Sequence, residues 1–175
     1  MSRAFVKEPD GGGPPEALPP RPVSPHPNYV TPAGLRELRQ TLAQLQERRA
    51  RLLAEHQQAA AHDDSSLAEE IALLDRDMRY YALRVESAIV VDPAGQERER
   101  VRFAATVTAR DVRGQRWRFT IVGEDEANLA AGKISYVSPL AQALDGARVG
   151  ETVRWQRPIG DLDLVVEGID YSSEV

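Results

Sequence analysis

Two runs of apolar residues with helical spacing constrain this chain more than any other feature. In the first run, leucine occurs at positions 35, 38, 42, 45 and 52, and Arg49 interrupts the pattern. The second run consists of Leu67, Ile71, Leu74, Met78, Tyr81, Val85 and Ala88. Alternating steps of three and four place these side chains on one face of a helix, which is typical of a coiled-coil seam.

The polar segment HDDSS at 62–66 separates the two runs. Two seams of similar length joined by a short polar turn predict an antiparallel coiled-coil helical hairpin over residues 31–91. Thr31 and Pro32 suit the N-cap and the first position of the first helix. Each arm would contain about 25–30 residues and extend roughly 40 Å. Two helices alone enclose no globular core, so we expect a projecting rod.

The residues before the hairpin have a different composition. Nine of the twelve prolines lie between positions 9 and 32, together with three consecutive glycines at 11–13. Few backbone donors and little apolar surface remain, so residues 1–30 are predicted to be a Pro/Gly-rich flexible leader. The alternative for the segment VSPHPNYV is that it docks on a partner.

After the hairpin, residues 92–100 (DPAGQERER) form a turn-rich linker, and residues 101–175 alternate between apolar and polar positions as strands do. The expected strands are one containing 101–107, one containing 117–121, one at 134–137, and two within 151–156 and 162–171. Ser138 and Pro139 suit the start of a short helix that reaches Leu144 and ends before Gly146. The predicted class is α+β, with the hairpin followed by an antiparallel sheet domain that carries one short helix.

Composition excludes several classes of protein. The chain is 42% hydrophobic and 28% charged, and no apolar run approaches the roughly 20 residues that a membrane span needs. The opening MSRAFVKE does not have the features of a secretory signal and the chain contains no cysteine, so we expect a cytoplasmic protein. A net charge of −5 gives no overall basic excess for binding nucleic acid.

Four short motifs carry a resemblance to a known family. They are IVG at 121–123, SPLAQAL at 138–144, VG at 149–150 and VVEGIDY at 165–171. Together with the helical hairpin, they resemble the GreA/GreB transcript cleavage factors of bacterial RNA polymerase over residues 31–171. The resemblance implies an FKBP-like C-terminal domain that docks at the mouth of the polymerase secondary channel, while the hairpin reaches toward the active centre.

By the same resemblance, Ser138, Pro139 and Leu140 would form the polymerase-binding face. The alternative is that Ser138 and Pro139 cap a helix and Leu140 fills the core. Many relatives have an acidic or polar residue just before the Ser-Pro pair, whereas this chain has Val137.

The hairpin tip departs from the family pattern. Cleaving members carry an Asp-x-Ser-Glu-Asn motif, whereas this chain has HDDSSLAEE, with Leu67 at the glutamate position. Asp63 and Asp64 are the candidate catalytic and metal-assisting residues, which would help to hold a transient Mg²⁺ shared with the polymerase, with no cofactor bound stably. The alternative is that both are ordinary turn and capping residues. Short arms and Leu67 also fit a non-cleaving, Rnk-like channel binder.

Arginines along the hairpin provide the remaining candidates. The resemblance implies that Arg48, Arg49, Arg51 and Arg79 contact the nascent RNA, and the alternative is a solvated face that pairs with acidic neighbours. The chain would then be a monomer that modifies the polymerase and is not itself an enzyme. A prolyl isomerase would need an aromatic pocket, but Trp117, Phe119 and Tyr136 are expected to pack in the core.

Overall fold

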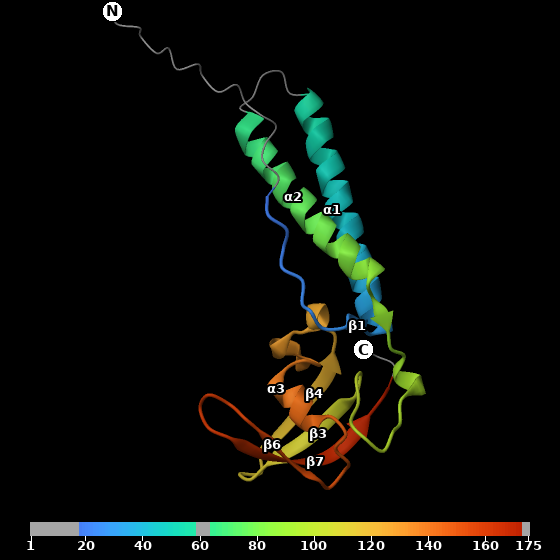
Figure 1. Cartoon of the computed structure of the whole chain (residues 1–175), viewed down its shortest axis with the longest axis vertical. Helices are drawn as coiled ribbons and strands as arrows, with labels where there is room; N and C mark the ends of the chain where they lie inside the picture. The colour runs from blue at the N-terminus through green and yellow to red at the C-terminus, as the bar shows by residue number, and fades with distance from the viewer. Residues whose placement is uncertain (1–17, 59–63, 173–175) are drawn as a thin grey trace, which may run out of the picture.

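The computed structural model describes residues 18–58 and 64–172. Two long helices, α1 (Pro32–Gln58) and α2 (Asp64–Glu86), lie side by side in opposite directions and project from a sheet domain (Figure 1). None of the helices in these ranges is both long and apolar enough to cross a membrane. The combination of helices with a separate sheet domain confirms the α+β class predicted from the sequence.

The helices pack along their predicted apolar faces. Leu38 of α1 and Leu74 of α2 are buried, and most other seam residues are half-buried, as expected for a two-helix pair. Arg49 interrupts the apolar seam, and its Nε lies 2.6 Å from Oδ1 of Asp75 on the opposite helix. The structure thus shows an antiparallel pair, and supercoiling of that pair stays a prediction.

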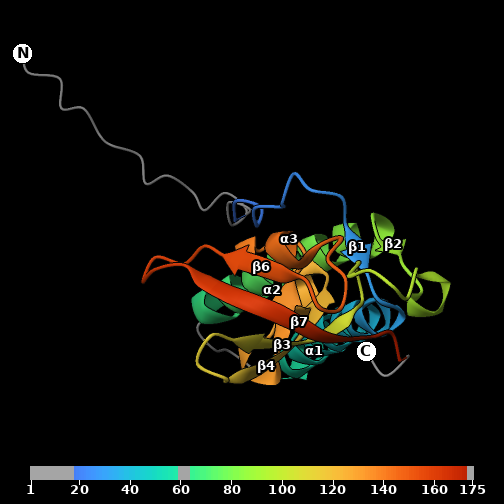
Figure 2. The same ribbon diagram turned by 90° about the horizontal axis from the view of Figure 1, so that it is seen from below.

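The second part is a five-stranded sheet with the order β5-β4-β3-β7-β6. The strands are β3 (Thr106–Asp111), β4 (Arg116–Val122), β5 (Lys133–Ser135), β6 (Thr152–Trp155) and β7 (Leu162–Asp170). Seen from below, β7 lies between β3 and β6 (Figure 2). The helix α3 (Pro139–Leu144) packs against this sheet, and Leu144, Leu164 and Val166 of the shared core are fully buried.

The sheet differs from the prediction at β5. This strand runs parallel to β4, with Thr120 opposite Lys133, so the sheet is mixed and not wholly antiparallel. The segment 123–132 explains the difference because it contains two short 3-10 helices, η2 (Glu124–Glu126) and η3 (Leu129–Ala131). They carry the chain back along β4, which a tight hairpin turn cannot do.

The first strand of the sheet also begins later than predicted, at Thr106 instead of near Val101. Residues 101–105 form a turn in which Ala104 has φ +68° and the Ala105 amide donates to the Arg102 carbonyl. The Tyr171 hydroxyl accepts from the Arg102 amide and donates to the Arg100 carbonyl. Apolar alternation in this segment therefore reflects burial in a turn and not a strand.

Residues of the expected leader take part in the fold. Tyr29–Val30 (β1) pairs in parallel with Ile89–Val90 (β2), which follows α2. The expected linker contains a third 3-10 helix, η1 (Pro93–Gly95), capped by the Asp92 side chain. Residues 1–17 lie outside the described residues, so flexibility of the leader there stays a prediction.

A buried carboxylate joins α1 to the sheet domain. Glu126 of η2 is 6% exposed, and its Oε1 accepts from the Thr31 amide at 2.9 Å and the Gly123 amide at 3.2 Å. Its other oxygen accepts from the Thr31 hydroxyl. That hydroxyl also accepts from the Gly34 amide, as an N-cap does. The N-terminus of α1 is thus fixed directly on η2.

Glycine at position 34 leaves the space that Glu126 occupies. A Cβ there would lie 2.0 Å from Cδ of Glu126, so Gly34→Ala must displace the carboxylate. We expect the free energy of unfolding to fall by about 2–4 kcal/mol, from overpacking and lost hydrogen bonds. Urea unfolding followed by circular dichroism measures the change.

Gly95→Ala is the matched control, because nothing lies within 4 Å of a Cβ built at that position. Its free energy of unfolding should change by no more than about 0.5 kcal/mol. Equal stability of the two variants would contradict the role assigned to Glu126.

Candidate functional site

A cavity of about 360 Å³ opens beside α3, at the end of the sheet domain nearest to the helices. Its lining includes His26, Tyr29, Arg102, Phe103, Ile121, Tyr136, Val137, Ala141, Gln142 and Asp145. These residues come from the leader, the turn before β3, the end of β4, and α3 with its preceding loop. The cavity therefore forms only when these separate segments of the chain fold together.

Three aromatic rings form one wall of this cavity. The ring centroids of Tyr29, Phe103 and Tyr136 lie 5.4–6.0 Å apart in tilted or edge-on arrangements. Tyr136 packs partly against the core, as expected, but it also lines the cavity. Its hydroxyl donates to the Pro27 carbonyl at 2.5 Å, and burial, together with the nearby charge of Glu124, raises its pKa. Rings fixed in this way can receive an apolar side chain.

The lining of the cavity also includes an ion pair at its rim. Nη1 of Arg102 lies 3.3 Å from Oδ1 of Asp145, the residue that ends α3, and both side chains are partly exposed. An exposed ion pair of this kind adds little stability. It does give the apolar cavity a polar edge, which is the usual anatomy of a protein interface.

The three predicted docking residues occupy different environments. Ser138 is the N-cap of α3, and its hydroxyl accepts from the Ala141 amide at 3.2 Å. Pro139 is exposed at the first helical position. Leu140, by contrast, is 4% exposed and belongs to the core, so it positions α3 and offers no surface to a partner.

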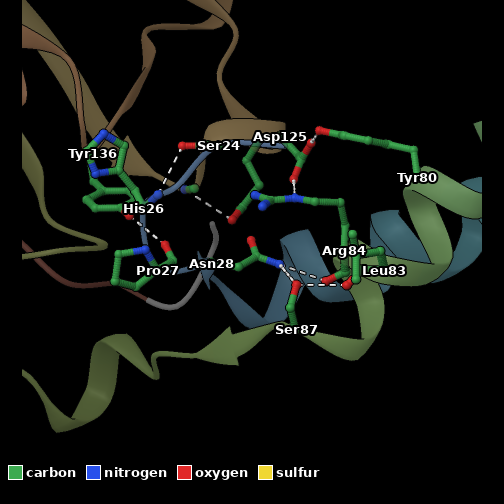
Figure 3. Close-up of polar contacts among 12 residues, drawn as sticks. Ser24, His26, Pro27, Asn28, Tyr80, Leu83, Arg84, Ser87, Asp125 and Tyr136 are labelled. Atoms are coloured by element: carbon green, nitrogen blue, oxygen red, sulfur yellow. Dashed lines mark hydrogen bonds and ion pairs between the residues drawn. The ribbon is translucent and has the colours of Figure 1, made fainter. Parts of the chain in front are cut away.

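A second joint connects α2 to the same 3-10 helix that receives α1. Nε of Arg84 lies 2.5 Å from Oδ2 of Asp125, and the Tyr80 hydroxyl donates to Oδ1 at 2.6 Å (Figure 3). The Arg84 and Asp125 side chains are only 3% and 13% exposed. Removing one partner of such a pair leaves the other charge buried and unpaired, which is strongly destabilising. Both helices are thus attached to η2.

The predicted catalytic pair falls where the sequence reaches the start of α2. Asp63 is outside the described residues, and Asp64 is the first residue of α2, with a side chain that is also outside them. Leu67, at the position of the family's glutamate, is half-buried in the described part of α2. The metal-assisting role of the two aspartates stays a prediction that rests on their residue type.

The four predicted RNA-contacting arginines are differently placed. Arg48 and Arg49 form ion pairs across the helices with Glu70 and Asp75, at 2.5 and 2.6 Å. Arg79 donates to the Leu18 carbonyl at 3.4 Å, and Arg51 is exposed. Pairing of Arg48 and Arg49 favours the alternative interpretation of a salt-bridged helix face.

Sequence analysis did not identify the residues that join the two parts. It assigned no role to Asp125, Glu126 or Arg84. One signal was present: three consecutive acids at 124–126 follow, after a single glycine, a strand whose last two residues are buried. Their partners Thr31 and Arg84 are 95 and 41 positions away, so spacing along the sequence could not reveal the contacts.

The fold defines a class of protein in which a pair of antiparallel helices is attached to a separate sheet domain. Comparison with known sequences identifies the family. Residues 96–171 match the family model described as "Transcription elongation factor, GreA/GreB, C-term". The chain is 35% identical over 153 residues to transcription elongation factor GreB of Neisseria meningitidis, covering 82% of this chain and 94% of the relative. It is also 35% identical over 145 residues to transcription elongation factor GreA of Sphingopyxis alaskensis, with 79% and 92% coverage. The chain belongs to the GreA/GreB family.

Two solved structures have a limited overall similarity to this chain. GreA factor homolog 1 of Thermus thermophilus is 25% identical, with a TM-score of 0.37 and 83% of this chain covered, as well as 99% of that chain. The GreA/GreB elongation factor of Nitrosomonas europaea is 21% identical, with a TM-score of 0.40 and coverage of 82% and 98%.

The α2 joint predicts an unusual alkaline titration. Burial, followed by the hydrogen bond to Asp125, raises the pKa of Tyr80 to about 12. The folded protein therefore holds this proton more tightly than the unfolded chain does. The resulting stability is complete below the ordinary tyrosine pKa of about 10 and is lost as the pH rises toward 12. Tyr80→Phe should remove the most alkaline step of tyrosinate formation, measured by near-ultraviolet absorbance.

Tyr81→Phe, one position along the same helix, is the control and should leave that step in place. Persistence of the step in Tyr80→Phe would show that Tyr80 does not have the raised pKa.

Proposed function

We propose that this chain binds RNA polymerase at its secondary channel and regulates transcription elongation. The observation that carries the proposal is that both helices are attached to η2, α1 by the Thr31–Glu126 hydrogen bonds and α2 by the Arg84–Asp125 ion pair. A helix pair attached in this way can be directed into a channel by the domain that carries it. Membership of the GreA/GreB family supports the choice of partner.

The docking face in this proposal is the exposed start of α3 together with the adjoining cavity. Pro139 presents exposed apolar surface, and the aromatic wall of the cavity would receive an apolar side chain of the polymerase. The Arg102–Asp145 pair at the rim would favour one orientation of the partner. Ser138 and Leu140 act indirectly, by capping and anchoring the helix.

At the far end of the rod, Asp63 and Asp64 would stimulate cleavage of backtracked transcripts. Two adjacent carboxylates suit Mg²⁺, which prefers oxygen ligands and would stabilise charge during phosphodiester hydrolysis. The aspartates would help to hold such an ion and orient water at the polymerase active centre. In this proposal the polymerase is the nuclease and the chain assists it, with Arg51 the exposed candidate for contact with nascent RNA.

A second candidate function is a channel binder that does not stimulate cleavage and competes with factors that do. Leu67 favours it, because an apolar side chain at the family's glutamate position cannot bind a metal. Helix length bears on the same question: α1 and α2 contain 27 and 23 residues. At about 1.5 Å per residue they extend roughly 40 and 35 Å.

A transcript-cleavage assay on stalled elongation complexes distinguishes the two functions. Under the first, the full chain should release short 3′ RNA fragments above the level of polymerase alone. Asp63→Ala with Asp64→Ala should reduce release to that level, because the double variant offers no carboxylate at these positions to hold the ion. Glu69→Ala, at an exposed acid in the first turns of α2, is the matched control.

Absence of fragments, combined with displacement of a cleaving factor from the polymerase, would reject the first function and establish the second. If the chain neither cleaves nor competes, both are wrong.

The docking face predicts a loss of affinity without unfolding. Pro139→Asp should weaken binding to the polymerase by about tenfold, because it places a charge at the centre of an apolar contact. The helix itself should tolerate the change, since an acidic residue suits a first turn. Val112→Asp, at a residue that is 80% exposed in the β3–β4 turn, is the control. Equal affinity of both variants, measured by fluorescence anisotropy, would place the docking face elsewhere.

A further inference from the structure

The proline-rich segment before the helices is attached at both ends. Residues 18–30, which we name the strap, run beside α2 and then cross to the sheet domain (Figure 1). The strap contains five prolines, at 19, 20, 22, 25 and 27. Nothing in the proposed activity requires these contacts, which makes their role a separate question.

The outer attachment is to the exposed side of α2. The Arg21 guanidinium lies over the Tyr80 ring, 3.9 Å from its centroid, and its Nη1 is 3.5 Å from Oδ1 of Asp77. A cation over an aromatic face is attracted by the ring electrons as well as by the carboxylate. Arg79 adds a hydrogen bond to the Leu18 carbonyl at 3.4 Å. The strap is therefore tied to α2 near the middle of that helix.

The inner attachment is to the end of α2 and to the sheet domain. Asn28 is 5% exposed, and its Nδ2 donates to the Arg84 carbonyl at 2.7 Å and to the Ser87 hydroxyl at 3.1 Å (Figure 3). One residue earlier, the Pro27 carbonyl accepts from the Tyr136 hydroxyl. Neighbouring strap residues thus contact α2 and the cavity wall at once.

Proline explains how the strap makes these contacts. Its ring fixes φ and removes the amide donor, so the chain is already extended and loses little entropy on docking. Contacts must then come from carbonyls and from side chains, as at Leu18, Arg21 and Pro27. The composition that predicted a flexible leader also suits a stiff connection between two surfaces.

Both joints described above lie on the three-residue element η2. Attachment to one short element restrains rotation about that element poorly. The strap meets the sheet domain at Tyr136, outside η2. On α2 it meets Tyr80, which belongs to the joint, and also Asp77, seven positions before Arg84, or about two helical turns from that residue. It therefore supplies a restraint that η2 does not.

We propose that the strap sets the direction of the helix pair relative to the sheet domain, with Arg21 and Asn28 as its positioning residues. The consequence for reach, which rests on the proposed function, is large. For a rod of about 40 Å, a rotation of about 10° at the joint moves the far end by roughly 7 Å.

Interspin distances in the free protein test the proposal without any polymerase. The chain has no cysteine, so Ala54→Cys on α1 and Val112→Cys in the β3–β4 turn place two nitroxide labels without background. Double electron–electron resonance should give one narrow distance distribution. Arg21→Ala with Asn28→Ala should broaden it or shift its mean by several ångströms, the displacement expected for a rotation of about 10°. Arg21→Lys in place of Arg21→Ala, which keeps the cation, should partly restore the narrow distance distribution.

Three controls separate direction from stability. Arg148→Ala removes an exposed arginine between α3 and β6 and should leave the distribution unchanged. Labels at Val112→Cys and Ile159→Cys, both within the sheet domain, should report the same distance in every variant. If the double variant loses helical circular dichroism, the surface substitution Arg21→Ala alone decides the result. The proposal is overturned if the helix-to-domain distribution stays that of the unmodified chain in folded variants.

A cleavage assay that fails while these distances respond would reject the proposed function and leave the strap in place.

Discussion

The structure depends on one buried carboxylate. Glu126 accepts hydrogen bonds from the amides of Thr31 and Gly123 and from the Thr31 hydroxyl, in a site where an unpaired charge would be very costly. The negative charge also lies at the N-terminus of α1, where the helix dipole favours it. Absence of a side chain at Gly34 makes the approach sterically feasible. The first helix therefore begins at a position that the sheet domain dictates, and α2 follows through Arg84 and Asp125.

One stretch of chain organises the whole molecule. Between the end of β4 and the start of α3 it provides η2, which roots both helices, then β5, then Tyr136 and the Ser138 cap. Only ten positions separate Glu126 from Tyr136, so the attachment of the helices and the wall of the cavity belong to one short stretch of chain. A partner that binds at the cavity contacts the support of the helices almost directly. Binding at the cavity can then fix the direction of the helices, because the residues that hold both lie close together.

Local patterns predicted local structure well. Heptad spacing located both helices, and the Ser-Pro pair located the start of α3, because periodicity and capping are read from neighbouring residues. Long-range features were missed for the same reason. The turn at 101–105 depends on Tyr171, the parallel direction of β5 on the path of 123–132, and the joints on partners 95 and 41 positions apart. Leu140 illustrates the limit for the site, since its motif is correct but its side chain is buried.

The ion pair between Arg49 and Asp75 has a consequence for the evolution of reach. It sits within an otherwise apolar seam, so sliding one helix past the other by a heptad would set a charged group against leucines. An insertion of seven residues in one arm, between the sheet domain and this pair, would produce that mismatch, whereas equal insertions in both arms would not. Lineages that lengthen or shorten the rod should accordingly show matched changes on both sides of the tip.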